Sequence, residues 1–162
     1  MRTHHARLAA VFLAAGVLNF SSGLANADEP VKKSPVAEKA TTDLERIQGT
    51  WHFVALEVEG AKITDGTFKE AKIVITGNEF ATISKEASYK GKLTLNASAS
   101  PKTIDLTYSE GPEKGNKSLG IYQLDGDTWT ICVTLAGAKD RPTKFETKPD
   151  SGLALETLKR AK

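Results

Sequence analysis

Gly49-Thr50-Trp51 opens the first clear strand pattern of the chain, and the interpretation of the remaining sequence starts from it. A glycine two residues before a tryptophan, at the head of a strand-rich chain, is typical of small antiparallel barrels. The indole fills the closed end of such a barrel, and the glycine lets the backbone turn tightly beside it. Residues 44–48 come directly before this stretch and predict a short helical turn, capped by Thr42 or Asp43.

Downstream of this stretch, short runs of alternating apolar and polar residues are separated by turn residues. No long helical pattern separates any two runs, which argues against parallel β-α-β units. Tight turns between sequential strands favour an up-and-down antiparallel order, and closure into a barrel removes exposed sheet edges. The predicted fold is therefore all-β, an antiparallel up-and-down β-barrel of about eight strands with a short N-terminal helical turn. The predicted strands are residues 51–58, 72–76, 80–84, 89–96, 101–108, 118–124, 128–135 and 152–160.

Residues 1–27 have the pattern of a secretory signal peptide. Arg2 and Arg7 make the start basic, residues 8–20 are mostly apolar, and Ala25-Asn26-Ala27 offers a small-x-small cleavage site. The apolar run is too short to prefer a membrane-spanning helix. We therefore expect an exported protein, periplasmic or extracellular, with no membrane span in the mature chain.

The segment that follows, residues 28–42, is polar, contains two prolines and shows no periodicity. It is expected to be a flexible linker, so the barrel domain spans residues 43–162. Without Arg2 and Arg7 the 22 Lys and Arg residues fall to 20, equal to the 20 Asp and Glu residues. A formally neutral mature chain gives no reason to expect nucleic acid or an anionic membrane as a partner.

Several segments between Asp43 and Arg160 match a known pattern and together cover nearly the whole barrel domain. The matching segments are Leu44–Trp51, Ile104–Leu106 with Glu110–Gly115, Gly120–Asp127, Ile131-Cys132, Arg141–Phe145 and Pro149–Gly152. Through them the chain resembles a family of uncharacterised exported domains that is abundant in planctomycete-type bacteria and is described as lipocalin-like. The resemblance implies a calycin-type β-barrel and no activity, since that family has none assigned. The three-residue barrel signature of lipocalins carries over at Gly49, Trp51 and, more loosely, Arg160.

Three patterns that suggest site chemistry lack what that chemistry needs. Gly111–Ser118 has Asn116 where a phosphate-binding P-loop requires its second glycine, and it leads into a strand rather than a helix. Asp125-Gly126-Asp127 lacks the further oxygen ligands of a calcium loop and predicts a hairpin turn. His52 is the only histidine after residue 27, which excludes a multi-histidine metal site, and it is expected to face outward. We therefore predict no metal, no cofactor and no enzymatic activity.

Cys132 is the single cysteine of the chain, so no intrachain disulfide is possible. It lies in the middle of the strand pattern over residues 128–135, between Ile131 and Val133. A cysteine in such a position is expected to be a buried small hydrophobe rather than a nucleophile.

Trp51 and Arg160 lie at the start of the first strand and the end of the last strand. In a closed up-and-down barrel of eight strands these two strands are antiparallel neighbours. We therefore expect the pair to meet at the closed end of the barrel, with the guanidinium stacked over the indole. Trp51 is out of phase with Val54 and Leu56, which predicts a bulge near His52-Phe53.

Two functions from different classes follow from this fold. The first is a binding module whose cavity takes a small apolar or amphipathic molecule. The alternative is a structural or protein-interaction domain with a filled interior and no ligand. Large residues such as Tyr122 pointing inward would fill so small a barrel, whereas small ones such as Gly91 would leave room. The candidate cavity-lining residues are Val54, Leu56, Tyr89, Leu106, Tyr108 and Trp129.

Overall fold

The computed structural model describes residues 41–64, 66, 68–135 and 139–162. The signal peptide predicted over residues 1–27 and most of the linker predicted over residues 28–42 lie outside the described residues. The described part contains one short helix, α1 (Asp43–Arg46), and nine strands. The strands are β1 (Gly49–Val58), β2 (Ala61–Lys62), β3 (Lys72–Thr76), β4 (Glu79–Ile83), β5 (Ser88–Asn96), β6 (Thr103–Glu110), β7 (Lys117–Asp125), β8 (Thr128–Thr134) and β9 (Leu153–Arg160).

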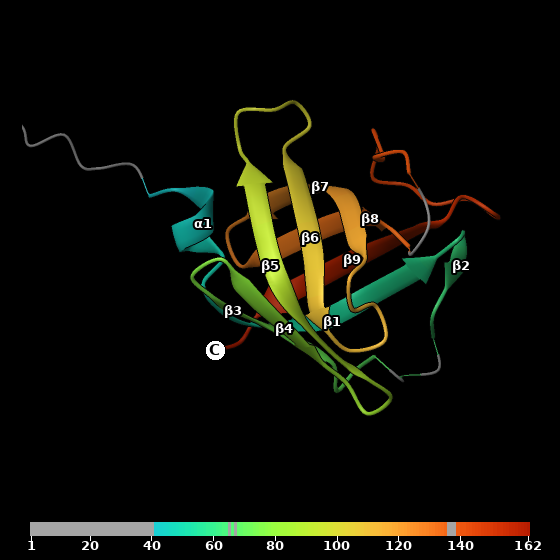
Figure 1. Cartoon of the computed structure of the whole chain (residues 1–162), viewed down its shortest axis with the longest axis horizontal. Helices are drawn as coiled ribbons and strands as arrows, with labels where there is room; N and C mark the ends of the chain where they lie inside the picture. Colours follow the sequence, from blue (N-terminus) through green and yellow to red (C-terminus); the bar gives the residue numbers. More distant parts are fainter. Residues whose placement is uncertain (1–40, 65, 67, 136–138) are drawn as a thin grey trace, which may run out of the picture. The chain divides into compact units, whose positions relative to one another are not determined.

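The strands form one antiparallel sheet in the order β2-β1-β3-β4-β5-β6-β7-β8-β9, and pairing of β1 with β9 closes it. Eight strands therefore make a closed up-and-down barrel, and the two-residue strand β2 adds to the end of β1. β5 and β6 cross in front of β7, β8 and β9 in Figure 1. The predicted fold, an antiparallel up-and-down barrel with a short N-terminal helical turn, is confirmed and is consistent with a lipocalin-like architecture.

A bulge in β1 changes which residues face the interior. The register of β1 against β9 shifts between Phe53 and Ala55, so that Phe53 pairs with Leu158 and Ala55 with Thr157. The extra residue, Val54, points outward. The sequence predicted a bulge near His52-Phe53, which is one to two residues before Val54. That prediction put Phe53 in the bulge itself, and so Phe53 was not counted among the inward-facing residues.

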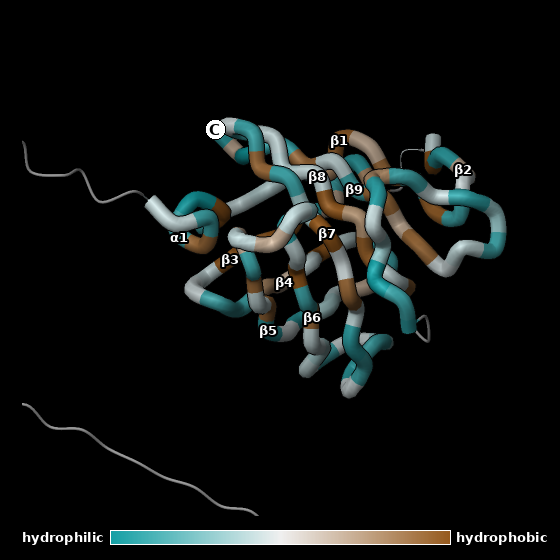
Figure 2. The backbone as a smooth tube through the Cα atoms, turned by 90° about the horizontal axis from the view of Figure 1, so that it is seen from above, coloured by the Kyte–Doolittle hydropathy of each residue, from teal (hydrophilic) through white to brown (hydrophobic). Residues whose placement is uncertain are grey.

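The hydrophobic core fills one half of the barrel most densely. Apolar and polar segments alternate along the strands (Figure 2), and the buried positions are mainly apolar ones. Trp51, Tyr122, Trp129 and Leu158 are each 0–1% exposed. The rings of Trp51 and Trp129 lie 5.5 Å apart and are tilted by 60°, a favourable arrangement for two aromatic side chains. These large residues leave little free volume at this end of the barrel, which we call the closed end.

Helix α1 is attached to the closed end by its first residue. Thr42 is the N-cap and forms a capping box with Glu45. The buried Asp43 carboxylate accepts hydrogen bonds from the Tyr122 hydroxyl at 2.8 Å and the Lys102 ammonium at 2.7 Å. Burial alone raises the pKa of Asp43, but these hydrogen bonds and the nearby positive charges outweigh it and lower the pKa below its ordinary value.

A segment without regular structure covers part of the outer face of the barrel. Ile121 of β7 and Cys132 of β8 pair with each other on the outward-facing side of the sheet, yet both are buried. The described residues between β8 and β9 account for this burial. The Cys132 thiol lies 3.8 Å from the carbonyl oxygen of Glu146, and Arg141 forms an ion pair with Asp105 of β6 at 2.6 Å.

Cys132 is expected to be unreactive in the native protein. It is 0% exposed, and burial raises the pKa of its thiol, which lowers the fraction of reactive thiolate. A disulfide reagent such as dithionitrobenzoate should therefore label the native protein only slowly at neutral pH, and label it fully in denaturant. Rapid labelling of the native protein would contradict the buried position of Cys132. Arg141→Ala removes the ion pair with Asp105 that holds the covering segment, and it should accelerate labelling.

Candidate functional site

The open end of the barrel contains a cavity of about 340 Å³. Its walls come from the ends of the strands that lie away from Trp51, including the second half of β1 and the beginnings of β5 and β9. The volume is within the range of small-molecule sites in proteins. Most of the wall is aromatic or aliphatic, and its larger apolar residues are Phe53, Leu56, Val58, Phe68, Tyr89 and Tyr108.

A smaller inner chamber of about 50 Å³ lies beneath this cavity, toward the closed end. The two spaces share Thr82, Tyr108, Val133 and Glu156 in their walls, so they meet at these residues. Aliphatic residues, Phe80 and Trp129 line the rest of the inner chamber. The barrel therefore has a filled half around the tryptophans and a hollow half that opens outward.

Glycine does not create the hollow half, contrary to the expectation for Gly91. A Cβ at Gly91 would lie 2.1 Å from the carbonyl oxygen of Thr107 and 2.8 Å from the Phe80 ring. The space beside Gly91 is therefore occupied by the neighbouring strand and by Phe80. The free volume lies instead beside small wall residues such as Ala71 and Ala154, in the part of the barrel that the side chains of Trp51 and Trp129 do not fill.

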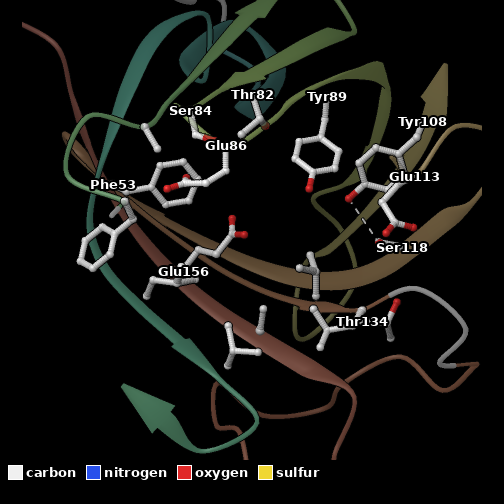
Figure 3. A pocket seen from close by; sticks show the side chains of 17 residues that line it. Phe53, Thr82, Ser84, Glu86, Tyr89, Tyr108, Glu113, Ser118, Thr134 and Glu156 are labelled. Carbon is white, nitrogen blue, oxygen red and sulfur yellow. Dashed lines mark hydrogen bonds between the residues drawn. The ribbon is translucent and has the colours of Figure 1, made fainter. Parts of the chain in front are cut away.

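Glu156 of β9 is the one charged residue at the junction of the two chambers. Its carboxyl points into the middle of the cavity (Figure 3). The side chain keeps some accessible surface because it borders the cavity, but it lies deep within the barrel wall. Burial raises the pKa of Glu156 to about 7. Among the described residues, none donates a hydrogen bond to this carboxyl.

The charge of the cavity wall is of one sign. Glu86 and Glu113 border the outer cavity together with Glu156, and no lysine, arginine or histidine does so among the described residues. Tyr108 faces the same space, and its hydroxyl lies 3.4 Å from that of Ser118. Burial raises the pKa of Tyr108 above its ordinary value, so this side chain stays neutral near pH 7. The described wall therefore carries acidic side chains and no basic ones.

A second polar group of the inner wall also lacks a protein partner. The indole Nε1 of Trp129 is buried and has no hydrogen-bond acceptor among the described residues. A buried donor without an acceptor is destabilising, and most such groups in native proteins are satisfied. Glu156 therefore offers a hydrogen-bond acceptor, and Trp129 a donor, that no described residue pairs with.

Five of the six predicted cavity residues border the two chambers. Leu56 and Tyr89 line the outer cavity, Leu106 and Trp129 line the inner chamber, and Tyr108 lines both. Val54 is the exception, and its prediction is corrected here. It is 50% exposed on the outside of the barrel because the bulge after Phe53 reverses the alternation of β1.

Sequence reasoning missed Glu156 as a site residue. The alternation of β9 places Ala154, Glu156 and Leu158 on one face, and this face proves to be the interior. That periodicity was a usable signal, because a glutamate between two inward-facing apolar residues must itself point inward. Phe68 was also missed, since it lies in a connection that has no strand pattern.

The predicted pair at the closed end is brought together. The guanidinium carbon of Arg160 lies 4.3 Å from the centre of the Trp51 ring. Arg160 also donates hydrogen bonds to the carbonyl oxygens of Gln48, at 2.8 Å, and Arg46. Gly49 has a φ of +101°, which glycine adopts without strain, and this conformation sets the turn between α1 and β1.

The three patterns that suggested site chemistry in the sequence lie in an exposed strand position, at a strand start and in a hairpin turn. His52 is exposed on β1, Lys117 begins strand β7, and Gly126 and Asp127 form the two-residue turn between β7 and β8. Within the described ranges, no group of three His, Cys, Asp or Glu side chains is arranged to hold a metal ion. None of the described helices is long and apolar enough to cross a membrane.

Comparisons with protein-family models, curated proteins and solved structures gave no match to this chain. The resemblance to the exported lipocalin-like domains therefore stays a prediction from the segments between Leu44 and Gly152. The barrel and the geometry of its cavity are established independently of any relative.

Proposed function

We propose that this protein binds a small apolar or amphipathic molecule in the open end of its barrel. The observation that supports the proposal is the cavity of about 340 Å³ behind a wall of mainly aromatic and aliphatic side chains. Burial of a ligand's apolar surface there would contribute roughly 25 cal/mol for each Å² removed from water. The hollow half also favours ligand binding over the alternative, a structural or interaction domain with a filled barrel.

The proposal describes a binding protein rather than an enzyme. The cavity wall contains carboxyl and hydroxyl groups, but the one histidine of the barrel domain, His52, lies on the outside of β1. No pair of a nucleophile and a general base is formed by the residues that border the cavity in the described part of the chain. The signal-peptide pattern of residues 1–27 supports a role outside the cytoplasm for this binding protein.

Nile red, a neutral dye whose fluorescence rises in apolar surroundings, tests the proposal. The wild-type protein should bind it saturably, because the cavity offers a mainly apolar site that opens to solvent at one end. Val58→Trp places a large ring at the cavity wall and should weaken dye binding by about tenfold or more, equivalent to at least 1.4 kcal/mol. Fluorescence titration at constant protein concentration gives both affinities.

Val54→Trp is the matched control. Val54 and Val58 are on the same strand, but the first lies on the outside of the barrel and the second lines the cavity. The control variant should bind Nile red as the wild type does. Equal binding by all three proteins would place the dye on the surface, and no saturable binding by the wild type would favour the filled-barrel alternative.

A further inference from the structure

We infer that the ligand of this cavity is an apolar amine whose ammonium group pairs with the Glu156 carboxylate at the junction of the two chambers. The inference rests on the proposed function and adds the chemical class of the ligand. The amine enters with its charged end first, and its apolar part occupies the outer cavity. Three observations carry the inference: the position of Glu156, its lack of a partner, and the charge of the wall around it.

The position of Glu156 suits recognition of one charged group. The carboxyl projects from β9 into the middle of an otherwise mainly apolar space, where a ligand of the cavity's size must contact it (Figure 3). A carboxylate in such a place has lost much of its hydration, which is costly unless an opposite charge approaches. Because no described side chain supplies that charge, an ammonium group from outside the protein would be its first ionic partner.

The remaining charges of the wall favour a cation and disfavour an anion. Glu86 and Glu113 border the outer cavity, so an anionic ligand would meet three carboxyl groups and no basic side chain of the described wall. A fatty acid would bring a fourth carboxylate into this space, and like charges in a poorly hydrated cavity repel strongly. An ammonium group is attracted by all three glutamates on its way to Glu156.

Aromatic side chains around the cavity add to the preference for a cation. The rings of Tyr89 and Tyr108 lie 6.1 Å apart in the wall, and Phe53 and Phe68 border the same space. The negative face of an aromatic ring attracts an ammonium group, and the attraction grows as water is excluded. The same rings offer apolar surface to the hydrocarbon part of the ligand, so one wall serves both parts of the molecule.

Isothermal titration with octylamine, 1-octanol and octanoate tests the inference, since the three molecules share one chain and differ in the head group. At about pH 8.5 the wild-type protein should bind octylamine about tenfold or more tightly than 1-octanol, and octanoate most weakly. Octylamine binding near pH 7 should release about half a proton, because the ammonium stabilises the ionised form of Glu156. Titrations in two buffers of different ionisation enthalpy measure this release.

The pH dependence of affinity gives a second readout. The titratable side chains that border the cavity besides Glu156 are Glu86, Glu113, Tyr89 and Tyr108. Between about pH 8.5 and pH 5.5, octylamine affinity should fall as Glu156 becomes protonated, while 1-octanol affinity should change little. Glu156→Gln should remove the amine preference, the proton release and the pH dependence together. Glu79→Gln changes an exposed carboxyl of β4 that borders neither chamber, and it should keep all three.

The outcomes separate this inference from the proposed function. If Nile red and 1-octanol bind but octylamine gains nothing over 1-octanol, the amine inference is overturned and the binding function stands. If Glu156→Gln retains the full amine preference, the ammonium site lies elsewhere and the inference is likewise overturned. If neither the neutral molecules nor octylamine binds, both fail. Glu156→Leu serves as a second variant, and it should bind 1-octanol at least as well as the wild type does.

Discussion

Trp51→Ala is expected to lower the free energy of unfolding by about 3–5 kcal/mol, the usual cost of removing a fully buried large aromatic side chain. Trp51 is 0% exposed and packs on Trp129 in the filled half of the barrel. Its indole Nε1 also donates a hydrogen bond of 2.8 Å to the carbonyl oxygen of Ile47, which holds α1 against the closed end. The variant therefore loses packing, a buried hydrogen bond and the attachment of the helix. Urea unfolding followed by circular dichroism measures the loss.

Arg160 provides the graded comparison for this prediction. Its guanidinium stacks on Trp51 and donates to the carbonyl oxygens of Gln48 and Arg46. Arg160→Ala should cost about 1–3 kcal/mol, from the lost stacking and the carbonyl groups left without a donor. Arg160→Lys should lie between the wild type and Arg160→Ala, because lysine keeps the charge but lacks the planar fork that stacks and reaches two acceptors.

The free energies of unfolding of Trp51→Ala, Arg160→Ala and Arg160→Lys test the packing at the closed end of the barrel, and we expect them to rise in that order. Lys159→Ala is a suitable control, since Lys159 is an exposed neighbour on the same strand and most exposed substitutions change stability by about 0.5 kcal/mol or less. A Trp51→Ala protein no less stable than Arg160→Ala would contradict the central packing role of the indole.

The fold was accessible from the sequence because local and global signals agree. Period-two alternation marks the strands, turn residues separate them, and the spacing of Gly49 and Trp51 marks the closed end. The error at Val54 has a local cause. A bulge shifts the alternation by one residue, so a bulge placed too early assigns the next residue to the wrong face.

The site was less accessible, because a cavity is a property of packing rather than of pattern. Alternation identifies inward-facing residues such as Leu106 and Tyr108, but it does not show which of them meet across the barrel. Phe68 reaches the cavity from a connection whose path has no periodic signal. The significance of Glu156 depends on the fact that no described residue places a basic side chain in the cavity wall. The strands that form this wall are far apart in the sequence.

Glu156→Gln is expected to stabilise the protein in a strongly pH-dependent way. The pKa of Glu156 rises from 4.5 to about 7 on folding, so between these values the folded protein binds more protons than the unfolded chain. By linkage, the wild type loses stability as pH rises through this window, and the loss levels off about one pH unit above the folded pKa. The difference in unfolding free energy between variant and wild type should grow by about 3 kcal/mol from about pH 4 to pH 8.5.

Urea unfolding of both proteins across this pH range measures the difference directly. Other groups that titrate on folding, such as Asp43 with its lowered pKa, contribute equally to both proteins and cancel. Glu86→Gln changes an exposed carboxyl at the same cavity and should show no comparable trend. Parallel stability curves for Glu156→Gln and wild type would contradict a buried carboxyl at the junction of the chambers.

A growing difference would mean that the fold carries a destabilising charge in its interior at neutral pH. A cost of this kind is typical of residues kept for binding rather than stability. Octylamine added at about pH 8.5 should then stabilise the wild type more than the variant, which links the cost of the charge to the ligand that it recognises.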